Sequence, residues 1–190
     1  LTNTLRHTVA PAVADVTIDW RGAGAVIVVA SSGEARSDSA GAGRGIGKGI
    51  AQVLAEAGAD VAINALTPTY VEGLAAEMSA ATGRRVIPVI ADVTKSDGAN
   101  RAVADVIAKL GRVDVLVNAL GDAIKKPLVA LPGTAGSGTP ISDDDLRFIM
   151  DINLTEALLC TRAVGPHMLA RKSGKVINVA TGRRISLNEL

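Results

Sequence analysis

The chain has 190 residues, of which 48% are hydrophobic and 21% are charged, and its formal net charge is +1. This composition is typical of a folded domain and excludes a disordered chain, while the near-neutral charge and the short apolar runs favour neither a nucleic-acid nor a membrane partner. A single cysteine, Cys160, excludes an internal disulfide and a multi-cysteine metal site, so we predict no metal.

The first residues show no sustained hydrophobic period. We predict an irregular leader over residues 1–24, followed by one domain over residues 25–190. The leader also lacks the charged start and apolar core of a signal peptide, which favours a cytoplasmic protein.

The apolar, β-branched run at residues 25–30 predicts a buried parallel strand. A polar loop over residues 31–39 then leads to a glycine-rich turn and a helix over residues 48–57.

Short apolar strands and amphipathic helices alternate along the rest of the chain. Further strands are predicted at residues 60–64, 85–90, 113–118 and 175–180. Helices are predicted at residues 68–81, from a cap at Ser96 to a stop at Gly111, and over residues 143–171 after a cap at Ser142. This alternation predicts an α/β fold with a doubly wound parallel sheet, a Rossmann-like sandwich of three layers.

The glycine-rich turn between the first strand and the first helix carries the clearest functional signal. Gly41, Gly45 and Gly47 allow a tight turn and a close approach of the backbone to a ligand. The helix that follows directs free N–H groups and the positive end of its dipole at that ligand. We therefore predict that this turn, including Arg44 and Ile46, binds a pyrophosphate at the carboxyl ends of the strands.

Four further motifs follow the glycine turn in order along the chain. They are residues 92–93, 114–121, 151–155 and 174–181. Together with the glycine turn they resemble the short-chain dehydrogenases/reductases. The resemblance implies that Asp92, Val93 and Asn118 also bind the cofactor, and that Asn153 and Thr181 are catalytic. Thr181 stands where the family has its catalytic Ser, with Ser186 as the alternative hydroxyl.

The chemistry that the resemblance implies is hydride transfer between a nicotinamide and a small-molecule carbonyl or alcohol substrate. In that family a Tyr-x-x-x-Lys pair moves the proton, a Ser polarises the carbonyl and an Asn positions a water. This chain ends at Leu190, before that pair, and its single tyrosine, Tyr70, is followed four residues later by Leu74. We therefore expect the chain to be truncated, with C-terminal strands and helices missing, and inactive alone. The alternative hypothesis is a non-catalytic dinucleotide-binding module.

The end of the second strand bears on the choice of cofactor. Residues 64–67, Asn-Ala-Leu-Thr, contain no carboxylate that would bind the ribose 2′-hydroxyl of NAD or repel the 2′-phosphate of NADP. Arg44 is a candidate partner for that phosphate, against the alternative of a solvated loop cation. We predict NADP as the cofactor, with NAD as the alternative.

Two later segments bear on substrate and assembly. The loop over residues 121–141 is expected to border the substrate pocket, and Lys125 and Lys126 on it either attract an acidic substrate or are solvated. The helix over residues 143–171 carries an apolar stripe that belongs either to the core or to a subunit contact. Its members are Leu154, Leu158, Thr161, Gly165 and Met168. We expect a homo-oligomer if a full-length chain exists.

Overall fold

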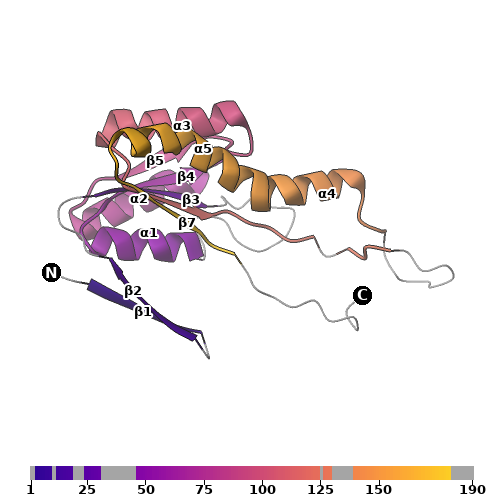
Figure 1. Cartoon of the computed structure of the whole chain (residues 1–190), viewed down its shortest axis with the longest axis horizontal. Coiled ribbons are helices and arrows are strands. Elements are labelled where there is room, and N and C mark those ends of the chain that lie inside the picture. The colour runs from indigo at the N-terminus through magenta and orange to yellow at the C-terminus, as the bar shows by residue number, and fades with distance from the viewer. Residues whose placement is uncertain are drawn as a thin grey trace.

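The computed structural model describes residues 3–9, 12–18, 24–30, 46–124, 126–129 and 139–180. The first two ranges are strands, β1 (Asn3–Val9) and β2 (Ala12–Ile18), which pair antiparallel as a two-stranded sheet of their own (Figure 1). The irregular leader predicted over residues 1–24 is therefore wrong for these segments. Their Val, Ile and Thr residues suit extended backbone, although they do not alternate regularly with polar ones.

A second sheet of five parallel strands forms the centre of the molecule. Its strands are β3 (Ala25–Ala30), β4 (Asp60–Ala65), β5 (Val86–Ile90), β6 (Val115–Ala119) and β7 (Lys175–Asn178). Their spatial order is β5-β4-β3-β6-β7, so the chain runs outward from β3 in one direction and then in the other (Figure 1). The predicted doubly wound sheet is confirmed, and its topological switch point lies between β3 and β6.

Helices cover both faces of this sheet and make the predicted three layers. The helical elements are α1 (Ile46–Glu56), α2 (Pro68–Thr82), α3 (Ser96–Leu110), α4 (Asp143–Met150), the π-helical turn η1 (Asp151–Thr155) and α5 (Glu156–Ala170). Val26 of β3 packs in the core with α1 and α2, whereas its neighbour Ile27 packs on the other face with α3 and α5. The alternation of side chains along a strand thus supplies both cores. None of the described helices is long and apolar enough to cross a membrane.

Local signals set most of the helix ends. Gly83 and Gly111 end α2 and α3 with φ of 66° and 87°, in the left-handed region that glycine adopts without strain. Ser142 caps α4 in a capping box with Asp145, as predicted for this serine. Ser96 is not the expected cap: it is the first residue of α3, and its hydroxyl accepts a hydrogen bond from Arg162 of α5.

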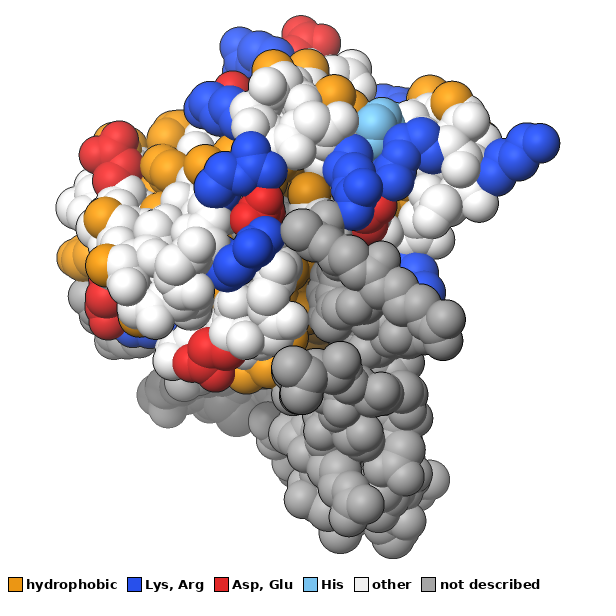
Figure 2. Space-filling view, turned by 90° about the vertical axis from the view of Figure 1, so that its left-hand side faces the viewer, with side chains coloured by type: hydrophobic (Ala, Val, Ile, Leu, Met, Phe, Trp, Pro, Cys, Tyr) orange, Lys and Arg blue, Asp and Glu red, His pale blue; other side chains and the backbone are white. Residues whose placement is uncertain are grey.

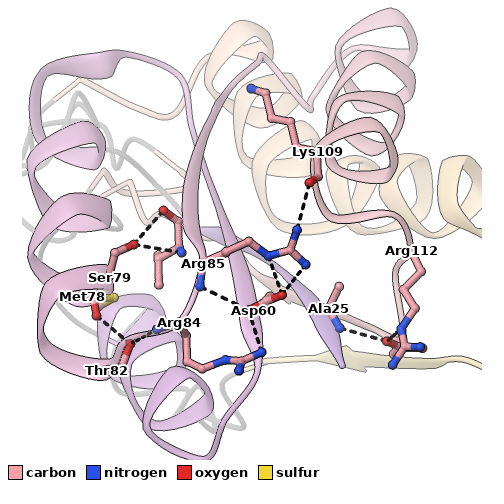
Figure 3. Close-up of polar contacts among 11 residues, drawn as sticks. Ala25, Asp60, Met78, Ser79, Thr82, Arg84, Arg85, Lys109 and Arg112 are labelled. Carbon is pink, nitrogen blue, oxygen red and sulfur yellow. Dashed lines mark hydrogen bonds and ion pairs between the residues drawn. The ribbon is translucent and has the colours of Figure 1, made fainter. Parts of the chain in front are cut away.

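Ion pairs with arginines hold two aspartates at the amino edge of the sheet, where Figure 2 shows basic and acidic side chains crowded together. Asp60, the first residue of β4, accepts hydrogen bonds from Arg84 at 2.8 Å and from Arg85 Nε at 2.8 Å (Figure 3). Asp114, just before β6, accepts one from Arg171 at 2.7 Å. Burial raises the pKa of each aspartate, but the hydrogen bonds and the arginine charges together outweigh it, so both pKa values lie below their ordinary value. These pairs fasten strand starts to helix ends.

Candidate functional site at the carboxyl edge of the sheet

The parallel topology brings several helix N-termini to the opposite, carboxyl edge of the sheet. α1 ends beside the start of β4, where the N–H of Ala59 donates to the carbonyl of Leu54. Likewise α5 ends just before β7, whose first N–H, that of Lys175, donates to the carbonyl of Asp114. Because each helix runs antiparallel to the strands, the starts of α1, α3 and α5 lie at the carboxyl edge. Ligands of doubly wound sheets bind at this edge, near the switch point.

Asn118, a predicted cofactor-binding residue, joins the ends of β6 and β7 and the start of α5. The residue is 3% exposed, and its Nδ2 donates to Asn178 Oδ1 at 2.8 Å and to the carbonyl of Ala157 at 3.4 Å. The N–H of Val179 donates to the carbonyl of Asn118 at 2.8 Å. Asn118 Oδ1 is buried without a hydrogen-bond partner among the described residues. Asn178 lies in the motif over residues 174–181, but no pattern in the sequence predicts its pairing with Asn118.

Asn153, a predicted catalytic residue, lies in η1, the π-helical turn that joins α4 to α5. Its Nδ2 donates to the carbonyls of Asp122 and Ile149, both at 3.0 Å, and its Oδ1 accepts from the N–H of Asp122 at 3.3 Å. A Cβ on Gly121 would lie 3.0 Å from Asn153 Oδ1, so a side chain there would crowd this contact. Asn153 thus fastens the segment after β6 to the helix, at the edge where Asn118 also lies. π-helical turns of this kind are frequent at functional sites.

Asp92 and Val93 follow β5 at the same edge. Asp92 Oδ1 accepts hydrogen bonds from the N–H of Thr94 at 3.0 Å and from its hydroxyl at 2.5 Å, which fixes the start of α3. Gly98 packs so closely here that a Cβ on it would lie 1.8 Å from the carbonyl oxygen of Asp92. Val93 is 3% exposed and belongs to the core between the sheet and α3 and α5. The side chains of both residues therefore have contacts within the protein.

The glycine turn is described only from its last two residues onward. Ile46 begins α1 and is 66% exposed, and Gly47 behind it is buried. The other predicted residues of the turn and the predicted catalytic threonine lie outside the described residues: Gly41, Arg44, Gly45 and Thr181. The start of α1 itself lies at the carboxyl edge, as the prediction for the turn requires.

The base of the loop over residues 121–141 is closed by polar contacts. Lys126 Nζ donates to Asp145 Oδ2 at 2.6 Å, and the N–H of Ile141 donates to the carbonyl of Pro127 at 2.9 Å. Hydrogen bonds from Lys126 and Ser142 hold the pKa of Asp145 well below its usual range. Sequence reasoning offered Lys126 as a substrate contact or a solvated cation, and neither interpretation included its ion pair with the buried carboxylate of Asp145. The other candidate lysine, at position 125, lies outside the described residues.

Glu156, which the sequence analysis did not select, is a buried acid at the start of α5. It is 1% exposed, and burial raises its pKa to about 7, although a hydrogen bond with Cys160 acts in the opposite direction. Burial also raises the pKa of the Cys160 thiol. One feature of the sequence could have indicated that Glu156 is buried. It stands in an i, i+4 series whose other members are apolar, Ile152, Cys160 and Val164. Within the described ranges, no three His, Cys, Asp or Glu side chains gather as a metal site requires.

Comparison with known proteins decides the family. A family model described as short chain dehydrogenase matches residues 39–183, most of the chain. The chain belongs to the short-chain dehydrogenase family. The resemblance inferred from the five motifs is therefore confirmed. Proteins of this family bind nicotinamide dinucleotides.

Individual short-chain dehydrogenases match the chain over about three quarters of its length. It is 37% identical over 142 residues to a short chain dehydrogenase of Pseudocercospora fijiensis (74% of this chain, 43% of the relative). It is 35% identical over 142 residues to 3-oxoacyl-(acyl-carrier-protein) reductase of Synechocystis sp. (74% and 53%). The chain thus spans about half the length of these relatives. A short-chain type dehydrogenase/reductase from Mycobacterium marinum has a similar structure, with TM-score 0.70 and 25% identity over 86% of this chain and 57% of that one.

Proposed function

We propose that a complete protein carrying this chain is an oxidoreductase that transfers hydride between a nicotinamide dinucleotide and a small carbonyl or alcohol substrate. The observation that carries the proposal is the meeting of Asn118, the η1 turn with Asn153, and the start of α1 at one edge of the sheet. Free N–H groups at a helix start suit a diphosphate, and the small Gly47 leaves room for a close approach. These features fit a dinucleotide.

The bound dinucleotide would supply the hydride chemistry, and the described residues would position it and the substrate. In this proposal Asn118 keeps the ends of β6 and β7 in register beside the nicotinamide. Asn153 holds the segment at Asp122 in place and orients a water for proton transfer. Thr181 provides the hydroxyl that polarises the substrate carbonyl. Asp92 and Val93 shape the edge near the adenine.

The end of β4 supports NADP as the preferred cofactor. Asn64 is buried, and its Nδ2 donates to the carbonyls of Val89 and Ala91 at 3.1 and 3.2 Å, so this amide is committed to the sheet. The following Ala65 and the 53% exposed Leu66 carry no charge that would repel a 2′-phosphate. Arg44 in the glycine turn would pair with that phosphate.

The test compares NADP and NAD binding, by calorimetry, in the parent protein and in Leu66→Asp. A carboxylate at this strand end repels the 2′-phosphate and accepts a hydrogen bond from a 2′-hydroxyl, so we expect about tenfold or more change in the NADP/NAD affinity ratio toward NAD. Leu169→Asp makes the same charge change on a 78% exposed residue near the amino edge, and it should leave the ratio unchanged. Preference of the parent protein for NAD would overturn the NADP proposal.

Turnover with a panel of carbonyl and alcohol substrates then separates the two functional hypotheses. Hydride transfer, followed by nicotinamide absorbance, supports the oxidoreductase. Tight dinucleotide binding without turnover by the complete protein would favour the non-catalytic binding module. Failure to bind either dinucleotide would exclude both. Because such a reaction draws on the cellular pool of dinucleotides, a cytoplasmic location forms part of the proposal.

The outer face of the α4–η1–α5 helix supports a homo-oligomer. Large apolar side chains recur on it every fourth residue and are between 43% and 62% exposed: Leu146, Met150, Leu154 and Leu158. Met168, from the stripe predicted by sequence, is instead buried in the core. We expect sedimentation analysis to show a dimer or larger species, and Leu158→Glu to shift it toward the monomer because a buried charge destabilises an apolar contact.

A further inference from the structure

Glu156 is buried where an ionised carboxylate would be unfavourable. It lies on the same sheet-facing stripe of α5 as the core residues Cys160 and Val164, at the end of the stripe nearer the carboxyl edge. Glu156 is 1% exposed, and its Oε1 has no hydrogen-bond partner among the described residues. Transfer of an unpaired carboxylate into such surroundings is strongly unfavourable, so the neutral acid is the form that fits this position.

The position of Glu156 connects the two asparagines of the candidate site. Its own N–H donates to the carbonyl of Asp151 and closes the π-helical turn that carries Asn153. The next residue, Ala157, accepts the hydrogen bond from Asn118 Nδ2. Asn118 Oδ1 is also buried without a described partner. Glu156 Oε1 and Asn118 Oδ1, both buried without a described partner, therefore lie in neighbouring parts of one junction between β6 and the start of α5.

No described cation compensates a negative charge on Glu156. From α5, Cys160 interacts with Glu156. On the elements packed against α5, Lys95 at the start of α3 pairs with Asp151 of η1 at 3.9 Å. Arg162 of α5 itself binds Ser96. On the β6 side, Asn118 is uncharged, and the ion pairs of Asp114 lie at the far, amino edge of the sheet.

We propose that Glu156 is a positioning residue of the carboxyl-edge site: its neutral form keeps the β6–α5 junction closed, and its ionisation displaces Asn118 and the turn that carries Asn153. Because dinucleotide binding at this edge rests on the proposed function, the structural effect and the binding effect are measured separately. The structural effect concerns the chain itself and needs no ligand.

The structural test follows the side-chain amide NMR signals of Asn118 and Asn153 in the ligand-free protein across neutral pH. We expect both to titrate with one midpoint near 7, together with the carboxyl carbon of Glu156. The buried amide of Asn64, which is bound to the carbonyls of Val89 and Ala91, serves as internal reference and should not follow that midpoint. Static signals from Asn118 and Asn153 while the Glu156 carboxyl titrates would overturn the proposal, even if no variant folds.

The second test uses Glu156→Gln, which keeps the size and neutrality of the protonated acid. The asparagine signals should lose their pH dependence in this variant, and they should keep it in Glu72→Gln, a matched change on the exposed face of α2. The dinucleotide affinity of the parent should fall severalfold from about pH 6 to pH 8.5, whereas that of Glu156→Gln should follow a flatter profile. Equal profiles would refute the binding effect. Absence of dinucleotide binding at every pH would count against the proposed function, while the NMR result would still decide the role of Glu156.

Discussion

The substitution Glu156→Gln should stabilise the protein at alkaline pH and have little effect at acid pH. Burial raises the pKa of Glu156 from an ordinary value of 4.5 to about 7 in the folded protein. Below pH 4.5 both the folded and unfolded chains hold the proton. Between these pKa values only the folded chain holds it, so the stability contributed by the neutral acid falls as pH rises and is lost above about 7.

The size of this loss follows from the difference between the two pKa values. At about 1.36 kcal/mol per pKa unit, a change from 4.5 to about 7 corresponds to about 3 kcal/mol in the free energy of unfolding. Because Gln does not ionise, the stability of Glu156→Gln relative to the parent should rise by about 2 to 3 kcal/mol from about pH 5 to about pH 8.5.

Urea unfolding of the parent, Glu156→Gln and Glu72→Gln at several pH values measures this difference. Subtracting parent from variant removes the titration of every other group that the substitution does not disturb. Glu72 is exposed on α2, so its variant should track the parent throughout. A parent–variant difference that stays constant across this pH range would refute the reasoning, because it would show that Glu156 has the same pKa folded and unfolded.

Three further predictions concern the framework of the site. Gly98→Ala should destabilise the protein by about 1–3 kcal/mol in urea unfolding, since its Cβ would lie 1.8 Å from the carbonyl oxygen of Asp92. The control Gly73→Ala has open space around the new Cβ and should be neutral or stabilising. Equal effects of the two substitutions would contradict the close packing at Gly98. Ser142→Ala removes the capping box of α4 and should lower stability by about 1 kcal/mol, and no change would refute the role of the cap. The pKa of Asp60 is lowered in the fold, so its stabilising effect is lost as pH falls below 3.8, and Asp60→Asn should unfold less steeply with acid than the parent; parallel acid titrations would count against this.

Most of the fold could be predicted because its signals are local. The apolar β-branched runs became strands β3 to β7, with ends within one or two residues of those expected. Gly83 and Gly111 ended helices as predicted, because a left-handed backbone at a C-terminus is a property of the residue itself. The antiparallel pair β1 and β2 was missed because a hairpin without regular alternation leaves a weak pattern.

The candidate site was only partly visible in the sequence. The motifs identified Asn118 and Asn153, and the structure places both at the carboxyl edge, where ligands of a doubly wound sheet were expected to bind. The π-helical turn around Asn153 was not predicted, since one extra residue in a helical turn leaves no change in hydrophobic period that a short window detects. Partners such as Asn178 were hidden because the hydrogen bond to Asn118 joins residues 60 apart.

The sequence by itself determined the order of strands and helices from residue 25 onward, the doubly wound architecture and the family, because these follow from hydrophobic periods, glycine stops and spaced motifs along the chain. Tertiary structure alone decided which polar groups are buried and which groups they pair with. Glu156, Lys126 and Asp60 are ordinary charged residues in the sequence, yet the fold buries Glu156 where no described cation pairs with it and gives the other two ion partners. Whether a polar group is buried or paired depends on segments distant in the chain. Burial and pairing in turn set the protonation state of side chains at the carboxyl edge and the rigidity of that edge.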